Sequence, residues 1–218
     1  MVAASHFAET LDRARGAVML MHDAPTAKDS WRAEAYIRGG LAEFGAMRDA
    51  LSRDLKRVGR PDKAYTPKDS RKPLIHLLSA MRDIEIHTAP SKARSAKTSV
   101  TIQRPDGSPF EFELDIVLLI DLTTDRLVAK REVAKAYERA QLDATVSWFN
   151  SQQDVFGASH LLGLGVAAYC SEILTAHRPQ PNNVEARVGR ARHESMEHSC
   201  LVGGGGPRSW SRLHLLWA

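Results

Sequence analysis

Residues 31–58, WRAEAYIRGGLAEFGAMRDALSRDLKRV, carry an apolar residue at almost every third or fourth position. The members of this apolar stripe are Ile37, Leu41, Phe44, Met47, Leu51, Leu55 and Val58. The spacing is typical of one face of an amphipathic helix, because an α-helix completes a turn in about 3.6 residues. Asp29-Ser30 before the stretch supplies N-cap residues, and Gly59-Arg60-Pro61 after it stops a helix. The sequence therefore predicts one long helix whose apolar face is covered by other helices.

The segments on both sides of this helix repeat its pattern. The stripe before it consists of Phe7, Leu11, Ala14, Val18 and Met21, and Pro25 ends that helix. The stripe after it consists of Leu74, Leu77, Leu78, Met81 and Ile84, and it runs out near Thr88-Ala89-Pro90. This third helix is capped either by Thr66, with Pro67 following, or by Ser70, with Pro73 inside the first turn.

Helical spacing returns in the second half of the chain. We expect a long helix from a cap at Thr123 or Thr124, with the stripe Val133, Tyr137, Ala140, Ala144, Trp148 and Val155, and a shorter apolar helix over about residues 159–176. Within the shorter helix, residues 163–168 formally fit the G-x-G-x-x-A dinucleotide fingerprint. That fingerprint requires a strand before it. Since a helix is expected there instead, these glycines indicate close helix packing, and no cofactor is predicted.

Between the helical segments the apolar period changes from about 3.6 to two. Phe110, Phe112, Leu114 and Ile116 alternate with acidic residues, and Val100 and Ile102 alternate with polar ones. Residues 104–109 supply proline, aspartate and glycine for a turn. We therefore expect a β-hairpin at about 98–118, preceded by a basic loop at 91–97. The predicted fold class is mainly α, a helical bundle with one inserted β-hairpin.

Composition limits the remaining possibilities. The chain has 43% hydrophobic residues and a net charge of +4, which suits a globular protein with a mildly basic surface. Its beginning has no uninterrupted apolar core, and its longest apolar stretch, residues 161–170, has half of the roughly 20 residues that a membrane span needs. We therefore expect a cytoplasmic protein without a membrane partner. Residues 1–178 are predicted to form the helical domain, and the Gly/Arg-rich residues 179–218 a disordered basic tail. His193, His198 and Cys200 in this tail match no closed metal site.

The predicted third helix contains Arg82-Asp83-Ile84-Glu85-Ile86-His87. This motif resembles the hallmark of the HEPN superfamily of prokaryotic helical domains, an arginine, often a polar residue next, and a histidine after four to six intervening positions. The resemblance covers roughly residues 5–90 by helix order, and 124–176 as later helices of the bundle. It implies a homodimer in which the arginine and histidine of two protomers face each other and cut RNA without a metal ion.

The resemblance assigns a role to each residue of the motif. Arg82 would hold the scissile phosphate as a bidentate cation. His87 would act as general acid or base, because an imidazole titrates near neutral pH. Asp83, four residues before His87, would orient the imidazole. On an ideal helix Arg82 and His87 diverge by roughly 140°, so the resemblance requires either a distorted helix end or an arginine that curls back.

Three alternatives stay open at this stage. The chain is an RNA-binding or RNA-cleaving domain, a non-catalytic helical interaction protein such as one half of a two-component system, or a DNA-binding regulator, although no helix-turn-helix spacing stands out. In the non-catalytic alternative Arg82 pairs with Glu85 on the surface and His87 interacts with the helix dipole. Basic residues between Arg53 and Lys72, with Lys92, Arg94 and Lys97, form a phosphate-attracting rim only if their loops fold near Arg82.

Overall fold

The computed structural model describes residues 4–60, 63–87 and 91–177. The described part contains, in chain order, α1 (Ala8–Asp23), α2 (Ser30–Arg57), α3 (Pro73–His87), β1 (Ala93–Gln103), β2 (Pro109–Leu119), α4 (Thr124–Val128), α5 (Arg131–Ala136), α6 (Arg139–Phe156) and α7 (Ala158–Ala176). The predicted fold class is confirmed: the protein is mainly helical, and the two strands form one antiparallel hairpin. In the described ranges, no helix combines the length and the apolar character that crossing a membrane requires. The predictions for residues 179–218, and for His193, His198 and Cys200, lie outside the described residues.

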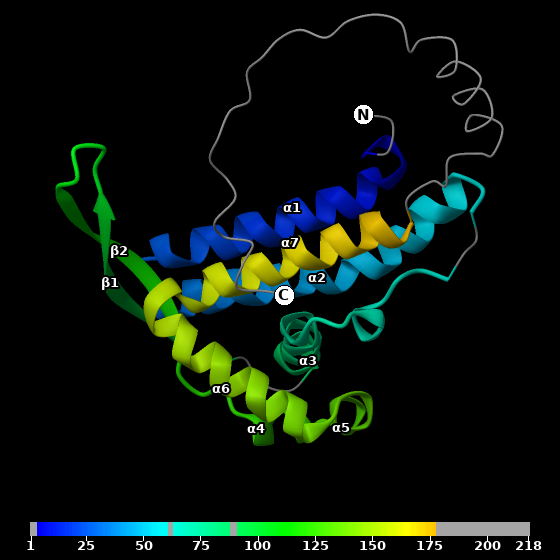
Figure 1. Cartoon of the computed structure of the whole chain (residues 1–218). Helices are drawn as coiled ribbons and strands as arrows, with labels where there is room; N and C mark the ends of the chain where they lie inside the picture. The colour runs from blue at the N-terminus through cyan, green and yellow to red at the C-terminus, as the bar shows by residue number, and fades with distance from the viewer. Residues whose placement is uncertain (1–3, 61–62, 88–90, 178–218) are drawn as a thin grey trace, which may run out of the picture. The chain divides into compact units, whose positions relative to one another are not determined.

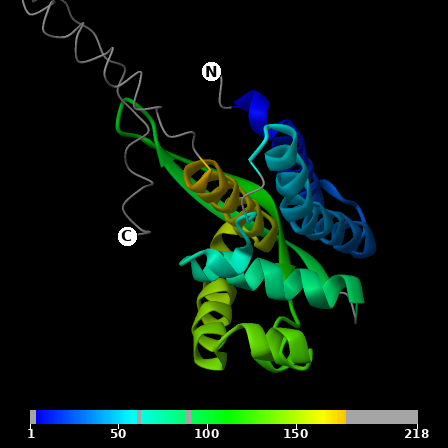
Figure 2. The ribbon, with the colours of Figure 1, turned by 90° about the vertical axis from the view of Figure 1, so that its right-hand side faces the viewer.

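The helices form two groups with α3 between them (Figures 1 and 2). α1, α2 and α7 run side by side, and α1 contacts both of the others. α3 packs against α2 and α7 on one side and against α6 on the other, with α4 and α5 at the end of α6. The hairpin extends from the end of the bundle where α6 meets α7. The position of α3 therefore fixes where the motif at its C-terminal end lies.

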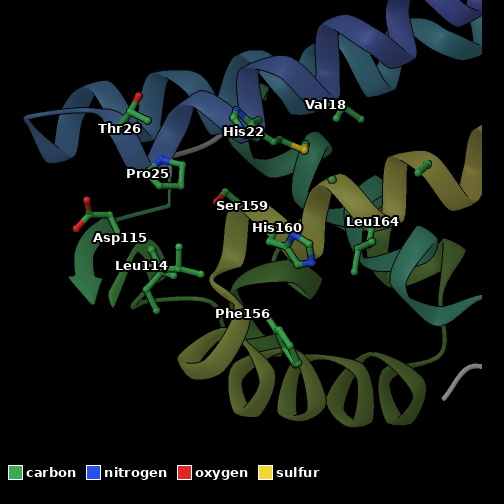
Figure 3. A pocket seen from close by; sticks show the side chains of 14 residues that line it. Val18, His22, Pro25, Thr26, Leu114, Asp115, Phe156, Ser159, His160 and Leu164 are labelled. Atoms are coloured by element: carbon green, nitrogen blue, oxygen red, sulfur yellow. The ribbon is translucent and has the colours of Figure 1, made fainter. Parts of the chain in front are cut away.

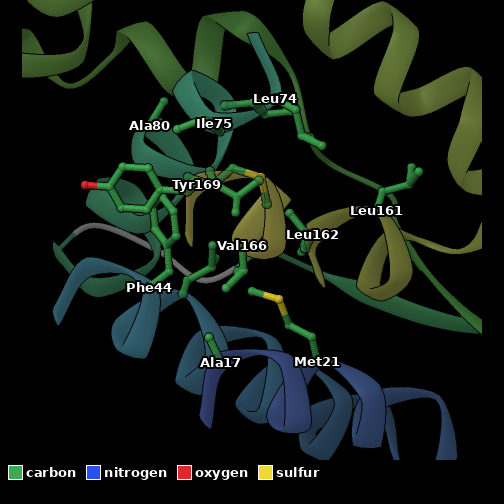
Figure 4. Packing of buried hydrophobic residues seen from close by; sticks show 14 of the residues in the cluster. Ala17, Met21, Phe44, Leu74, Ile75, Ala80, Leu161, Leu162, Val166 and Tyr169 are labelled. Carbon is green, nitrogen blue, oxygen red and sulfur yellow. The ribbon is translucent and has the colours of Figure 1, made fainter. Parts of the chain in front are cut away.

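The apolar core lies where α1, α2, α3 and α7 meet (Figure 4). The stripe predicted for α2 is buried here from Ile37 to Leu55, as are α3's Ile75 and α7's Leu162. The rings of Phe44 and Tyr169 lie 5.2 Å apart, and the Tyr169 hydroxyl donates a hydrogen bond to the Tyr65 carbonyl oxygen at 2.8 Å. Burying one large apolar side chain contributes about 1.5–3 kcal/mol, so this cluster is the main source of stability for the α1–α2–α3–α7 packing.

Two glycines allow the helices of this core to approach closely. A β-carbon at Gly40 of α2 would lie 2.8 Å from the Met21 Cγ atom and 3.1 Å from the Ala17 carbonyl oxygen, both on α1. A β-carbon at Gly165 of α7 would lie 2.8 Å from the Leu78 Cδ1 atom on α3. Such distances leave no room for a methyl group, so both glycines are needed for helix packing. For Gly165 the packing predicted from the sequence is present.

A buried carboxylate ties α1 to the C-terminal half of α2. Asp54 is fully buried, and its Oδ2 atom accepts hydrogen bonds from the Thr10 backbone amide and hydroxyl, both at 2.9 Å. Its Oδ1 atom accepts from Arg57 at 2.7 Å. Because a buried charge is tolerated only when it is paired and hydrogen-bonded, these contacts fix the register between α1 and α2.

The hairpin is longer than predicted. β1 begins at Ala93, and Ala93–Lys97 pair with residues 115–119 of β2, so the prediction of a loop at 91–97 was wrong. This part of β1 has no apolar alternation, since Arg94, Ser95 and Lys97 are exposed. It forms a strand because its partner residues 116–119 are buried and because the Ala93 amide donates to the Glu34 carboxylate of α2 at 3.0 Å. The strand structure of residues 93–97 therefore depends on pairing with β2 and on the contact with α2.

The helix predicted from Thr123 or Thr124 to Val155 is broken into α4, α5 and α6. Thr123 is the N-cap, as one of the two alternatives predicted, and its hydroxyl accepts from the Arg126 amide at 3.3 Å. The breaks fall at Lys130 and at residues 137–138, which have extended backbone angles. They let Val133 and Tyr137 pack into the core, with the Tyr137 ring 5.0 Å from the His76 ring of α3. The broken helix thereby contacts α3 in turn at Glu85, Asp83 and His76, through Arg126, Lys130 and Tyr137.

Candidate functional site

The helix α3 carries the motif and begins later than either of the two predicted caps implies. Thr66 and Asp69 form a reciprocal capping box, but it caps only the short 3₁₀ turn Pro67–Asp69. Ser70 is not the helix cap either: its hydroxyl accepts from the Lys72 amide at 3.0 Å, and α3 begins only at Pro73, two residues after the start that a cap at Ser70 predicts. α3 then remains a regular α-helix through the backbone of His87. The side chain of His87 lies outside the part of the chain that the structure describes.

Arg82 lies across α2 at Gly45. A β-carbon at Gly45 would lie 2.5 Å from the Arg82 Nε atom and 3.2 Å from the Cδ and Cζ atoms. The Nε atom is buried and has no hydrogen-bond partner within the described residues, whereas 36% of the side-chain surface is exposed. The NH1 group donates to the Asp83 carboxylate at 2.9 Å. The guanidinium group is therefore held between α2 and Asp83, with part of it open to solvent.

The contact with Asp83 turns Arg82 toward the face of α3 that contains the His87 backbone. Residues four positions apart lie on one face of a helix, so Asp83 and His87 share a face. The Arg82 side chain is thus bonded to the residue that follows it in the chain, which lies on the helix face that positions 83 and 87 share. By contrast, the alternative of an Arg82–Glu85 surface pair is wrong, because Glu85 is buried and contacts other partners.

Other cations come to this half of α3 from distant parts of the chain. The Lys130 ammonium group, between α4 and α5, donates to the Asp83 carbonyl oxygen at 3.0 Å. Arg38 lies seven residues before Gly45, hence on the same face of α2, and its Nε atom is buried without a hydrogen-bond partner among the residues described. Neither residue was predicted, since only tertiary contacts bring them near α3. Buried N–H groups are usually hydrogen-bonded, so the two unpartnered Nε atoms of Arg38 and Arg82 distinguish this region.

Glu85 fixes the chain that leaves α3. Its Oε1 atom accepts a hydrogen bond from the Ser91 amide at 2.6 Å, and the Arg126 NH2 group lies 4.0 Å away. Arg126 of α4 also contacts Asp121 at 2.7 Å and the Ser91 hydroxyl at 3.2 Å. Burial raises the pKa of Glu85 above its ordinary value, against the lowering effect of these hydrogen bonds and of Arg126. The network joins the end of α3, the start of the hairpin and α4, so it also limits where His87 lies.

Three of the basic residues expected to form a rim near Arg82 are paired with carboxylates elsewhere. Arg53 pairs with Glu9 of α1, and Arg57 pairs with Asp54 at 2.7 Å. Lys97 pairs with Glu113 across the hairpin at 2.8 Å. These cations pair with carboxylates on α1, α2 and β2. Near Arg82, the Lys130 ammonium group is bonded to the Asp83 carbonyl oxygen, and the charge of Arg38 acts on Glu85.

A second feature is an apolar groove between α1, α7 and β2 (Figure 3). Its cavity volume is about 590 Å³, and a neighbouring cavity of about 510 Å³ continues it along α1 and α7. Large apolar side chains on its walls are exposed: Val18, Leu114, Phe156 and Leu164. His22 and His160 line it from opposite helices (Figure 3). The groove offers a surface for an apolar partner.

No family model, curated protein or solved structure matches this chain. Across residues 4–60, 63–87 and 91–177, no group of three or more His, Cys, Asp or Glu side chains converges in a way that could hold a metal ion. The two candidate regions are therefore the half of α3 around Arg82 and the groove between α1, α7 and β2.

The raised pKa of Glu85 predicts a pH-dependent difference between the wild type and Glu85→Gln. The stability that protonated Glu85 contributes is fully present below its unfolded pKa of 4.5 and is lost as pH rises through the higher folded pKa. The free energy of unfolding of the wild type should therefore fall relative to that of Glu85→Gln as pH rises from 4.5 through the folded pKa. Urea unfolding across this range measures the difference, with the exposed Glu111→Gln as control. A difference between wild type and Glu85→Gln that does not change with pH would contradict the assignment.

Proposed function

We propose that this protein binds RNA and cleaves it as a homodimer, without a metal ion, through Arg82 and His87. The observation that carries the proposal is the position of the Arg82 guanidinium, which lies on α2 at Gly45 and is turned toward Asp83. It is held beside the helix face that contains the His87 backbone while part of it stays accessible. A cytoplasmic location and the absence of a membrane partner belong to the same proposal.

Arg82 is the phosphate-binding group of the proposed site. A guanidinium presents five N–H donors in a plane that matches the oxygens of a phosphate. Asp83 occupies one of these donors and α2 covers another, which leaves terminal N–H groups for a phosphodiester. Lys130, bonded to the Asp83 carbonyl, adds positive charge nearby. Such charge favours the polyanionic backbone of RNA in a salt-dependent manner.

His87 supplies the proton transfers. As general base it removes the proton of the ribose 2′-hydroxyl, whose oxygen attacks the adjacent phosphorus. The bond from phosphorus to the 5′ oxygen breaks, and that oxygen takes a proton from a general acid, which is the His87 of the second protomer. The products are a 2′,3′-cyclic phosphate and a 5′-hydroxyl. Arg82 stabilises the negative charge that develops on the phosphorane oxygens.

Asp83 connects the two functional groups in this proposal. A carboxylate has two oxygens and about four acceptor sites, and only Oδ1 contacts Arg82. The other oxygen is on the helix face shared with His87, where it is available to orient an imidazole one turn away. Asp83 therefore holds the arginine and positions the histidine.

A second candidate is a non-catalytic interaction protein, the partner half of a two-component system. The groove between α1, α7 and β2 favours it, because contiguous exposed apolar surface marks interaction sites. In this case Arg82 and Asp83 form a surface ion pair that binds no substrate. The two candidates differ in whether the wild type cuts RNA.

Replacing Arg82 or His87 by alanine should abolish RNA cleavage and leave the fold intact. Arg82 is partly exposed and His87 is the last residue of α3, so we expect a stability change of about 0.5–1 kcal/mol. The assay is a mixed RNA pool with wild type, Arg82→Ala, His87→Ala and a chelator, analysed for 2′,3′-cyclic phosphate ends. Arg53→Ala, which removes an exposed arginine paired with Glu9, is the matched control and should cleave normally. Activity that persists in both site variants, or that the chelator abolishes, would refute this site.

The proposed site also predicts self-association, because acid and base come from two protomers. Sedimentation velocity at micromolar concentration should show a dimer, with closed two-fold symmetry as the commonest arrangement. A monomer that nevertheless cleaves RNA would rule out the composite site.

A further inference from the structure

Gly45 and Arg82 make the closest contact between a glycine and a charged side chain in the described part of the chain. Three consecutive atoms of the arginine, Cδ, Nε and Cζ, lie within 3.2 Å of the point where a β-carbon of residue 45 would be. The guanidinium group is therefore pressed against the surface of α2. A side chain of any size at position 45 overlaps it.

The contact at Gly45 differs in kind from the packing contacts at Gly40 and Gly165. A β-carbon at Gly40 meets the buried Met21 side chain and the backbone of α1, and one at Gly165 meets buried leucine side chains of α3. At Gly45 all three nearest atoms belong to the distal part of one flexible, partly exposed side chain. Alanine at position 45 would consequently displace the guanidinium and leave the α2–α3 packing in place.

The hydrogen bonding of Arg82 shows which way the group is aimed. Its Nε atom is buried against α2 without a partner in the described residues, and its NH1 group is bonded to Asp83. A buried, unpaired N–H group is unfavourable, so this geometry is not one that hydrogen bonding by itself selects. It is selected by the recess at Gly45, and it leaves the outer edge of the guanidinium facing away from α2.

We propose that Gly45 is a positioning residue that seats the Arg82 guanidinium on α2 so that its terminal N–H groups face a phosphate-bearing ligand. The identity of that ligand as RNA rests on the proposed function. The position of the Arg82 guanidinium against Gly45 follows from the contact distances alone. Inorganic pyrophosphate binding tests this position without any need for RNA cleavage.

The test compares Gly45→Ala with Gly163→Ala in the full-length protein. Gly163 is the matched control, because it lies inside α7 and a β-carbon there meets no atom within 4 Å. The ¹⁵N–¹H resonance of the Arg82 Nε group, assigned with Arg82→Lys, reports the position of the guanidinium against α2. Titration with pyrophosphate reports anion binding, and thermal unfolding confirms that each variant is folded.

In the wild type, the Arg82 Nε proton should exchange slowly with water and shift on addition of pyrophosphate. In Gly45→Ala, this resonance should move and exchange faster, and pyrophosphate affinity should fall about tenfold, the scale of one charge-assisted hydrogen bond. The thermal unfolding temperature should not fall, since alanine favours a helix. Gly163→Ala should match the wild type in resonance and affinity.

Two results would overturn the proposal. The first is an Arg82 Nε resonance and a pyrophosphate affinity that are unchanged in Gly45→Ala. The second is a wild-type Arg82 resonance that does not respond to pyrophosphate. The two proposals can fail separately. If Gly45→Ala alone changes the Arg82 resonance and weakens pyrophosphate binding, the role of Gly45 is supported even when the protein cuts no RNA.

Discussion

The packing of α3 between the α1–α2–α7 layer and α6 is the constraint on which the rest of the structure depends. Leucines of α3 meet Gly165 of α7, and Arg82 meets Gly45 of α2, so both contacts are close because one side has no β-carbon. The buried Glu85 then binds the chain that follows α3 through Ser91 and Arg126. Helix, hairpin and α4 meet at this carboxylate. A motif at the end of α3 is consequently held on several sides.

The same region contains polar groups that work against stability. The buried Nε atoms of Arg38 and Arg82 have no hydrogen-bond partner in the residues described, and burial raises the pKa of the Glu85 carboxyl group above its ordinary value. Each unpaired buried donor costs about 1–3 kcal/mol, in a domain whose net stability is on the order of 5–15 kcal/mol. Such unfavourable groups concentrate where a protein binds or reacts. This concentration agrees with the proposed role of α3 and is independent of the resemblance.

Local periodicity was sufficient to predict the elements whose own sequence decides their structure. α1, α2 and α7 and the distal hairpin follow apolar spacing and end at the expected prolines and glycines. The strand at 93–97 and the breaks at Lys130 and Glu138 depend on tertiary contacts, and the sequence pattern does not contain them. For the candidate site, the resemblance proposed Arg82 and Asp83, and the structure shows that Arg82 is bonded to Asp83 and not to Glu85. Gly45, Arg38 and Lys130 come from other helices and loops, so no local signal links them to Arg82.

The central claim is that Gly45 acts on an anionic ligand through Arg82. A double-mutant cycle on RNA affinity, with Gly45→Ala, Arg82→Ala and the double variant measured by filter binding at one salt concentration, tests it most directly. The account predicts that Gly45→Ala weakens binding in the wild-type background and has no further effect once Arg82 is alanine. Equal losses in both backgrounds, or no RNA binding by the wild type, would contradict it.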